Sequence, residues 1–313
     1  MEMKSYSKPI KRNPADFFKL IFSGFCMGCA DIIPGVSGGT IAFILGIYEE
    51  IIQSIRSFIH KEVFVSIVTF RFLKTWKLIN GAFLLSVGLG IILAILTLSH
   101  TIEMLLTEYP TYIWSLFFGL VLASVFIVSR RIKKWKLRLV AGLILGTVAA
   151  YLIVGMVPVQ TPETWWFILF SGAIAICAMI LPGVSGSFLL VLLGKYEFVL
   201  HAVNERDIKS IGIFFIGAVA GLIIFSQILG WLLRRFHDIT IVVLIGFMLG
   251  SLRRIWPWKA TENGVELMQK NALPQFVQDG TLLVESFVIL GLMGIGVILV
   301  LLLERFAASR RSY

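Results

Sequence analysis

The chain has 313 residues, of which 58% are hydrophobic and 15% are charged, and its formal net charge is +10. Soluble domains carry about 25% charged residues, so this chain has too few charges to cover a water-facing surface. Because its apolar runs do not alternate with polar residues, they predict an all-α polytopic membrane protein rather than a β-barrel, and Lys and Arg in cytoplasmic loops account for the net charge without nucleic acid as a partner.

The first apolar stretch, residues 17–48, is too long for one membrane crossing and is interrupted by Pro34 and several glycines. A helical crossing needs about 20 residues, and a proline followed by glycines breaks the helical hydrogen bonds. Backbone freed in this way survives at membrane depth only inside protein or beside a water-filled cavity. We expect a re-entrant hairpin of broken helices, with two tightly turned full crossings as the alternative.

Residues 55–77 follow this hairpin and mix bulky apolar side chains with Arg and Lys. This composition is typical of a helix that lies in the membrane interface. Arg71 and Lys74 are candidates for attracting the headgroups of anionic membrane lipids. Ordinary anchoring of a cytoplasmic loop by its positive charges explains them equally well.

Six further stretches have the length and apolar composition of full crossings. They cover residues 78–98, 112–128, 139–157, 211–233, 239–256 and 286–304. Between the third and the fourth lies a second long stretch, residues 165–194, which is broken at Pro182. We expect a second re-entrant hairpin there.

The distribution of basic residues predicts the orientation of the chain. Lys and Arg gather in the N-terminal tail, in residues 55–77, in the loop 129–138 and at the C-terminus. If both hairpins return to the side from which they enter, all these clusters and both termini lie in the cytoplasm, as the positive-inside rule requires. Arg253 and Arg254, at an outer helix end, are the exception.

An internal repeat organises the whole chain. A shift of 148 residues places Pro34–Glu49 on Pro182–Glu197 with nine identities in sixteen positions, and Gly119–Ser124 resembles Gly246–Ser251. Three crossings separate the two hairpins, and because this number is odd, the second half is inverted relative to the first. The predicted fold is two inverted-topology repeats, residues 1–157 and 158–313, each a broken hairpin followed by three transmembrane helices, as in secondary transporters.

The tips of the hairpins have the residues of an anion site. Glycines permit a tight turn, Ser37 can cap the half-helix that follows, and the free N–H groups at the start of that helix attract negative charge. Two such tips predict a cradle for a phosphate or a carboxylate, although glycine and serine also occur where helices pack closely. The candidate substrate-binding residues are Pro34, Gly35, Ser37, Gly38, Gly39, Thr40, Pro182, Gly183, Ser185, Gly186 and Ser187.

Carboxylates near the hairpins are candidates for coupling transport to the movement of a proton or a cation. Asp31 lies deep in apolar sequence, where an ionisable residue indicates function, and the repeat places Met179 at the corresponding position. It could carry a proton, bind a cation or accept hydrogen bonds from the broken backbone. Glu49 and Glu197 end the two hairpins, where a structural role is as plausible as proton handling. We assign no histidine to a metal site and expect no cofactor.

At these residues the sequence resembles the bacterial polyprenyl-phosphate transporters, a family formerly called a domain of unknown function. The resemblance rests on GCADIIPGVSGGTIAFILGIYE (28–49) and LPGVSGSFLLVLLGKYE (181–197), and the repeat extends it over essentially the whole chain. It implies a carrier that returns undecaprenyl phosphate, the lipid carrier of cell-wall sugars, from the outer to the inner leaflet of the cytoplasmic membrane. Such a carrier needs a lateral groove, because the apolar chain of its substrate stays in lipid.

Two alternative functions remain open at this point. Undecaprenyl-diphosphate phosphatases have inverted repeats and a related Pro-Gly-x-Ser loop, but in that family an arginine follows the serine, whereas Gly38 and Gly186 stand here. Without a cation, phosphoryl transfer lacks its main charge stabiliser. A transporter of a small soluble anion would use the same cradle. The sequence does not set the oligomeric state.

Overall fold

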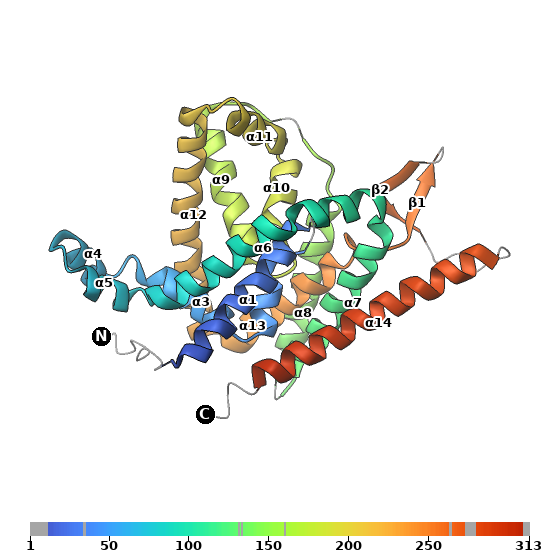
Figure 1. Ribbon diagram of the computed structural model, residues 1–313, viewed down its shortest axis with the longest axis horizontal. Helices are drawn as coiled ribbons and strands as arrows, with labels where there is room; N and C mark the ends of the chain where they lie inside the picture. The colour runs from blue at the N-terminus through green and yellow to red at the C-terminus, as the bar shows by residue number, and fades with distance from the viewer. Residues whose placement is uncertain are drawn as a thin grey trace.

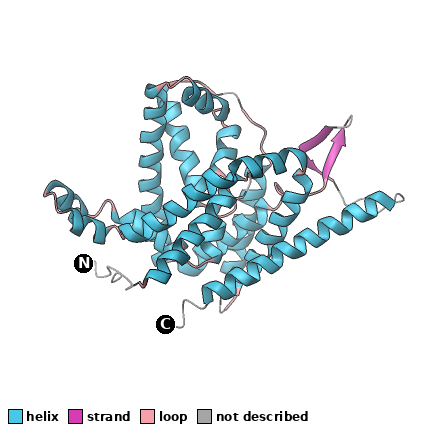
Figure 2. Cartoon of the chain, viewed as in Figure 1, coloured by secondary structure: helices cyan, strands magenta, loops and turns pink. Residues whose placement is uncertain are grey.

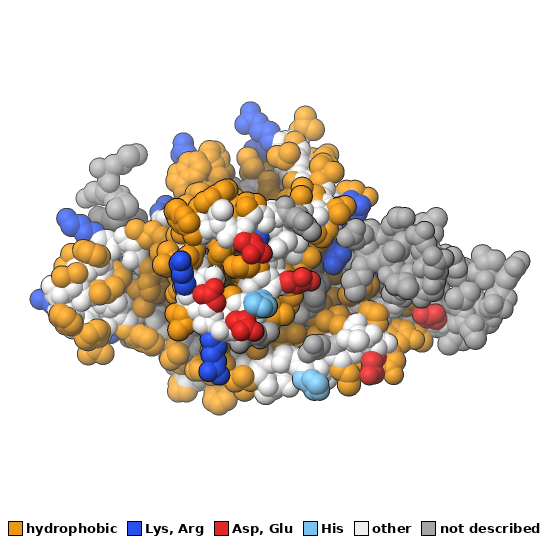
Figure 3. Space-filling model, turned by 90° about the horizontal axis from the view of Figure 1, so that it is seen from above, with side chains coloured by type: hydrophobic (Ala, Val, Ile, Leu, Met, Phe, Trp, Pro, Cys, Tyr) orange, Lys and Arg blue, Asp and Glu red, His pale blue; other side chains and the backbone are white. Residues whose placement is uncertain are grey.

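The computed structural model describes residues 12–33, 36–130, 132, 134–159, 161–262, 265–272 and 280–308. In this part of the chain it has fourteen helices and one two-stranded hairpin, so it is nearly all helical (Figures 1 and 2). Pro34 and Gly35, which the sequence analysis assigned to the first tip, lie outside the described residues. Figure 3 shows hydrophobic side chains over much of one face, with charged side chains in small groups between them.

The first broken stretch forms α1 (Pro14–Ile32), α2 (Gly38–Ile44) and α3 (Tyr48–Ser57). Because an α-helix rises 1.5 Å per residue, the seven residues of α2 span about 10 Å, a third of the hydrocarbon core. By itself, α2 is therefore too short to cross the membrane. All seven residues of α2 are buried, so this short helix lies in the core of the bundle.

The second broken stretch has the same plan, with α9 (Trp165–Ile180), α10 (Gly186–Leu192) and α11 (Tyr196–Asn204). The axes of α10 and α11 differ by 108°. The turn after each short helix contains a glycine in the left-handed region, Gly46 with φ 71° and Gly194 with φ 60°. Only glycine adopts this conformation without steric cost, which explains why the Leu-Gly pair is present in both repeats.

The segment after the first hairpin differs from the expected single interfacial helix. It contains two short helices, α4 (Lys61–Val68) and α5 (Phe72–Leu78), which project from the bundle (Figure 1). The chain turns between them at Phe70, whose φ of 52° cannot continue a right-handed helix. No residue of α5 is buried.

Helices coincide with all six predicted crossings. They are α6 (Gly81–Glu108), α7 (Pro110–Ser129), α8 (Leu137–Val154), α12 (Ile208–Arg235), α13 (His237–Ser251) and α14 (Gly280–Ala308). Five of these are long and apolar enough to cross a membrane. The exception is α13, whose 15 residues fall short of the roughly 20 that a crossing needs. The predicted full crossing over 239–256 therefore extends beyond the observed helix, which by itself is too short to cross the membrane.

A β-hairpin that the sequence analysis did not predict connects α13 to α14 (Figure 2). It consists of β1 (Lys259–Glu262) and antiparallel β2 (Val265–Asn271). Side chains attach its base to the preceding segment, since the Trp256 indole N–H donates to the Ala272 carbonyl at 2.9 Å. The Lys259 ammonium donates to the Arg254 carbonyl and to the Asn271 side chain.

Glycines bring pairs of helices into backbone contact, and the same contacts recur in both halves. The pair α1 and α6 leaves no room for a Cβ at three glycines, and the pair α9 and α12 leaves none at three others, and two of the contacts in each pair correspond. The corresponding contacts in the first pair are Gly24 with the Val87 carbonyl and Gly90 with the Ile21 carbonyl; those in the second are Gly172 with Phe214 and Gly217 with Leu169. Gly172 and Leu169 follow Gly24 and Ile21 by 148 positions, and Phe214 and Gly217 follow Val87 and Gly90 by 127.

The remaining long helices repeat this pattern across the two halves of the chain. α7 packs on α14, and α8 packs on α13, so each half supplies one helix to each pair. The contacts of the pair α7–α14 are Gly119 with the Met293 carbonyl and Gly296 with Leu116; those of the pair α8–α13 are Gly246 with Leu143 and Gly146 with Val243. The two sequence halves are thus intertwined rather than packed as separate domains.

Candidate functional site

The first tip is built by hydrogen bonds of Ser37. Its Oγ accepts from the Gly39 N–H at 3.1 Å and so caps the N-terminus of α2, as the sequence predicts. The same hydroxyl donates to the Met179 carbonyl at the end of α9, also at 3.1 Å. Ser37 is therefore buried and fully engaged in holding the first hairpin against the second.

The two hairpins meet directly at their tips. The Gly183 N–H in the second tip donates to Thr40 Oγ1 in the first at 3.1 Å, and the Tyr48 hydroxyl donates to the Ile180 carbonyl at 3.1 Å. Glycine is required at position 183 because φ is +85° and a Cβ there would lie 2.9 Å from the Phe247 carbonyl oxygen. The tips of the two hairpins are therefore in contact.

The side chain of Asp31 accepts a hydrogen bond from the backbone of the first tip. Its Oδ1 accepts from the Gly38 N–H at 2.7 Å, while the Gly39 and Thr40 N–H groups bond the side chain and the carbonyl of Ser37. Among the described residues, the donors that the sequence assigned to an anion at this tip are thus already paired. The carboxylate of Asp31 occupies the position that a bound anion would take.

The second tip lacks this internal anion. Met179 replaces the carboxylate, and no hydrogen bond among the described residues satisfies the N–H groups of Gly186 and Ser187. Ser185 makes no capping bond, and its Oγ lies 2.8 Å from that of Ser187. The two tips therefore share Pro-Gly-Val-Ser-Gly but differ chemically, because the N–H groups of Gly38 and Gly39 are paired among the described residues whereas those of Gly186 and Ser187 are not.

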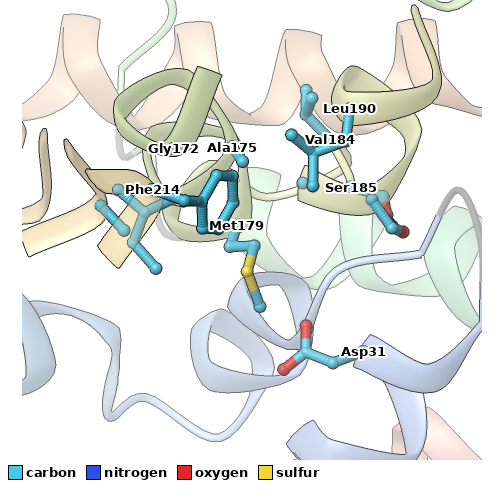
Figure 4. A pocket seen from close by; sticks show the side chains of 12 residues that line it. Asp31, Gly172, Ala175, Met179, Val184, Ser185, Leu190 and Phe214 are labelled. Atoms are coloured by element: carbon cyan, nitrogen blue, oxygen red, sulfur yellow. Dashed lines mark hydrogen bonds between the residues drawn. The ribbon is translucent and has the colours of Figure 1, made fainter. Parts of the chain in front are cut away.

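A cavity of about 240 Å³ lies beside the second tip and also reaches Asp31 (Figure 4). Asp31 lines it from α1, Met179 from α9, Phe214 from α12, and Ser185 and Ser187 from the start of α10. Most of the remaining lining is apolar or glycine. The cavity thus combines two hydroxyls and free backbone donors with one carboxylate in surroundings of low polarity, where electrostatic interactions are strong.

The other predicted site residues lie away from this cavity. Glu49 and Glu197 are exposed in the first turns of α3 and α11, where the helix dipole stabilises a negative charge. Glu49 Oε1 lies 3.2 Å from His237 Nε2. Partial burial lowers the pKa of His237, but hydrogen bonds to Asp238 and Glu49 outweigh it and raise the pKa above its ordinary value. Pro182 is buried in the second tip.

The predicted headgroup residues lie on the projecting helices. Arg71 precedes α5 and Lys74 lies within it, and both side chains are exposed. Large apolar side chains surround them, among them Phe72 and Leu73, which are 68% and 81% exposed. The two helices therefore present cations and apolar groups together, the combination typical of interfacial helices.

One cation near the second hairpin was missed as a site candidate. Arg254 follows α13, and its guanidinium carbon lies 5.0 Å from the centre of the Phe188 ring on α10. None of the ion pairs among the described residues includes it. In the sequence it appears only as an exception to the charge rule for loops. That exception is the one signal that would have identified it, since a partly buried cation without a carboxylate partner is costly.

Comparisons with known proteins agree on one family. The sequence profile of a family described as undecaprenyl phosphate translocase-like matches residues 27–273, which include Asp31 and both tips. The chain is 43% identical over 310 residues to the polyprenyl-phosphate transporter of Vibrio cholerae, covering 93% of this chain and 97% of that protein. It is 30% identical over 261 residues to the polyprenyl-phosphate transporter of Staphylococcus aureus, covering 76% and 85%. No solved structure matches the chain.

Proposed function

Because this chain belongs to the undecaprenyl phosphate translocase-like family and is a multi-pass membrane protein that transports polyprenyl phosphate, we propose that it is a flippase for undecaprenyl phosphate. It carries this lipid across the bacterial cytoplasmic membrane and so recycles the carrier for cell-wall synthesis. Both termini lie in the cytoplasm in this proposal, since that orientation places most basic clusters there.

The proposed architecture is a pair of inverted repeats with re-entrant hairpins. Three observations support it: the short helices α2 and α10, the left-handed glycines that follow them, and the glycine contacts that recur at fixed offsets between the halves. In transporters with such repeats, substrates bind near the midplane where broken helices meet. Here that meeting point is the contact between Thr40 and Gly183.

The phosphate binds in the cavity at the second tip. The observation that carries this assignment is the difference between the tips: Asp31 pairs the Gly38 N–H, whereas the Gly186 N–H has no acceptor among the described residues. The hydroxyls of Ser185 and Ser187 line the same cavity. A phosphate oxygen placed there would accept hydrogen bonds that the protein leaves unmade, and charged acceptors make the stronger bonds.

In this proposal Asp31 couples the transport of the lipid to the movement of a proton. It lines the cavity with the two serines, so a bound phosphate and the carboxylate would be two anions at close range. Like charges at such a distance favour a shared proton over full ionisation of both groups. A proton bound at Asp31 would lower the repulsion when phosphate enters, and its release would accompany phosphate departure.

Alternating access requires that the contact between the hairpins change. The Ser37, Thr40 and Tyr48 hydroxyls each join the first hairpin to the second. Movement of the two hairpins against each other would break and remake these three neutral hydrogen bonds, each worth only about 1 kcal/mol net. The contact is thus specific enough to define one state and weak enough to open.

The site is tested by binding in lipid nanodiscs. We expect purified protein to bind undecaprenyl phosphate but not undecaprenol, and the double variant of Ser185→Ala with Ser187→Ala to weaken binding about tenfold or more. Free phosphate is assayed in the same samples. Release of phosphate would establish the phosphatase alternative, and equal affinity for inorganic phosphate would favour a carrier of soluble anions.

A further inference from the structure

A second cavity, of about 550 Å³, lies on the other side of α9 from the phosphate cavity. All sixteen residues that line it are apolar, glycine or cysteine. They come mainly from α9 and α12, with Ile153 of α8 and Phe247 of α13 at its edge. Its volume falls within the range of about 300–1,000 Å³ that is typical of ligand pockets.

This apolar groove opens to the side of the molecule. Phe170 and Ile224 line it from α9 and α12 and are 53% and 60% exposed, and Ile228 one turn further is 51% exposed. In a helix that crosses a membrane, exposed apolar side chains face lipid. A chain lying in the groove would therefore remain continuous with the bilayer.

The groove and the phosphate cavity share a wall. Gly172, Ala175 and Met179 of α9 face the phosphate cavity, while the groove is lined by Leu169, Ala173 and Cys177 of the same helix. These sets repeat every three to four residues, so they occupy two faces of one helix. Val184, in the loop between α9 and α10, lines both cavities and marks the point where they adjoin.

We propose that the groove binds the isoprenoid units nearest the phosphate of the transported lipid, with the chain passing Val184. The inference rests on the proposed phosphate site. A polyprenyl phosphate has one apolar chain attached directly to its phosphate, which matches one polar cavity adjoining one apolar groove. In a phospholipid, glycerol and two ester groups separate the phosphate from two hydrocarbon chains, so a phospholipid does not match this arrangement.

The groove provides orientation and selectivity more than affinity. Moving an apolar chain from lipid into an apolar groove gains no hydrophobic free energy, because lipid tails are as apolar as the side chains; only packing contacts remain. Branched isoprenoid units packed against Phe170 and Phe225 would hold the phosphate end in place beside Ser185. Blocking the groove should therefore reduce transport without abolishing occupation of the phosphate cavity.

The test uses a matched pair of variants. Ile224→Trp places a bulky ring in the groove, and Ile144→Trp makes the same change on α8, at a residue that is 57% exposed and lines neither cavity. In proteoliposomes we expect Ile224→Trp to reduce transport of undecaprenyl phosphate at least fivefold and Ile144→Trp to leave it unchanged. Binding of dimethylallyl phosphate, whose single isoprenoid unit does not fill the groove, should be equal in both variants and the wild type. Equal transport by both variants would overturn the inference.

A labelling experiment does not depend on the folding of variants. A polyprenyl phosphate with a photoreactive diazirine in its second isoprenoid unit is reconstituted with wild-type protein, and the labelled peptides are identified by mass spectrometry. We expect labels on α9 and α12 within residues 169–181 and 220–228, displaced by excess undecaprenyl phosphate but not by phosphatidylglycerol. Labels elsewhere, or equal displacement by phosphatidylglycerol, would refute the groove while leaving the phosphate site standing. Failure of wild-type protein to bind any polyprenyl phosphate would instead refute the proposed function.

Discussion

Asp31 and Met179 occupy equivalent positions in the two repeats, and this exchange, together with Gly39 and Thr40 against Ser187 and Phe188, gives the two tips different chemistry. The bond from the Gly38 N–H to the Asp31 carboxylate is charge-assisted, and such bonds contribute about 1.5–3 kcal/mol. At the other tip the thioether of Met179 offers only a weak acceptor. The backbone donors of the first tip are thus paired within the protein, whereas we propose that those of the second bind the substrate.

Exchange of Asp31 for asparagine tests its role in coupling. We expect Asp31→Asn to keep the fold, because the amide oxygen can still accept from Gly38, but to remove the response of transport to a pH gradient. Glu49→Gln is the control, since Glu49 is exposed and lines neither cavity. Transport in liposomes with and without a gradient distinguishes them. A gradient response that survives Asp31→Asn and disappears in Glu49→Gln would move the coupling site to the end of the hairpin.

The serines of the two tips are expected to differ in the same way. Ser37→Ala removes a helix cap and a bond between the hairpins, so it should lower the free energy of unfolding by about 1 kcal/mol. Ser185→Ala removes no bond to the backbone among the described residues, so it should weaken transport while the melting temperature stays unchanged. Thermal unfolding and transport of both variants provide the comparison. A stability loss in Ser185→Ala as large as in Ser37→Ala would contradict the assignment.

Arg254 is a further residue whose charge can be tested. Its guanidinium lies beside α10, the helix that begins at the open tip. We expect Arg254→Gln to weaken the binding of undecaprenyl phosphate severalfold, because it removes a cation beside that helix, and Arg254→Lys to restore part of it. The cation–π contact alone is worth about 0.5–2 kcal/mol, so thermal unfolding is measured in parallel. Unchanged binding in Arg254→Gln would remove it from the site.

At the scale of elements, glycine contacts hold the long helices together in pairs. In α12, a Cβ at Gly217 would run into the Leu169 carbonyl, whereas a Cβ at Gly212 meets nothing within 4 Å. We expect Gly217→Ala to lower the melting temperature, because two backbones must separate, and Gly212→Ala to maintain or raise it, because alanine favours helix by about 1 kcal/mol. Equal effects of the two substitutions on thermal unfolding would contradict the close packing of α9 on α12.

The elements predicted from the sequence are those with a strong local signal. Apolar length identified the long helices, and Pro34, Pro182 and the glycines around them identified both breaks. The turn at Phe70 and the strands after Lys259 have no such signal, since their conformations depend on neighbouring segments. A hydrogen bond from the broken backbone was one of three hypotheses for the buried Asp31, and the fold shows that the donor is the Gly38 N–H, which the sequence could not identify.

At the scale of the whole molecule, the helices α4 and α5 extend the protein along what we propose is the cytoplasmic interface. Arg71 and Lys74 should each gain about 1 kcal/mol from anionic lipid. We expect Arg71→Gln with Lys74→Gln to reduce the dependence of transport on phosphatidylglycerol content, and Arg206→Gln with Lys209→Gln, exposed before and within the start of α12, to leave it unchanged. Transport in liposomes of graded phosphatidylglycerol content tests this. Identical dependence in both double variants would show that Arg71 and Lys74 only anchor the loop and do not attract lipid headgroups.

The proposed repeats also define how the molecule would work as a unit. α8 of the first half packs on α13 of the second, and α14 of the second packs on α7 of the first. These pairs join the halves, whereas the first helix of each hairpin packs with a long helix of its own half, α1 with α6 and α9 with α12. In the proposed mechanism the hairpins move against this shared scaffold, and the hydrogen bonds between their tips, with those of Arg56 on α3 to Gln227 on α12, would be exchanged in that movement.

We propose that the protein moves an intact lipid phosphate between leaflets, and a transport assay that follows each leaflet separately would show this movement. Purified protein is reconstituted in liposomes with labelled undecaprenyl phosphate, and loss of label from the outer leaflet is followed with and without a pH gradient while free phosphate is assayed. We expect a loss of label that requires protein, releases no phosphate and responds to the gradient. Label that stays in the outer leaflet of liposomes containing folded protein would contradict it.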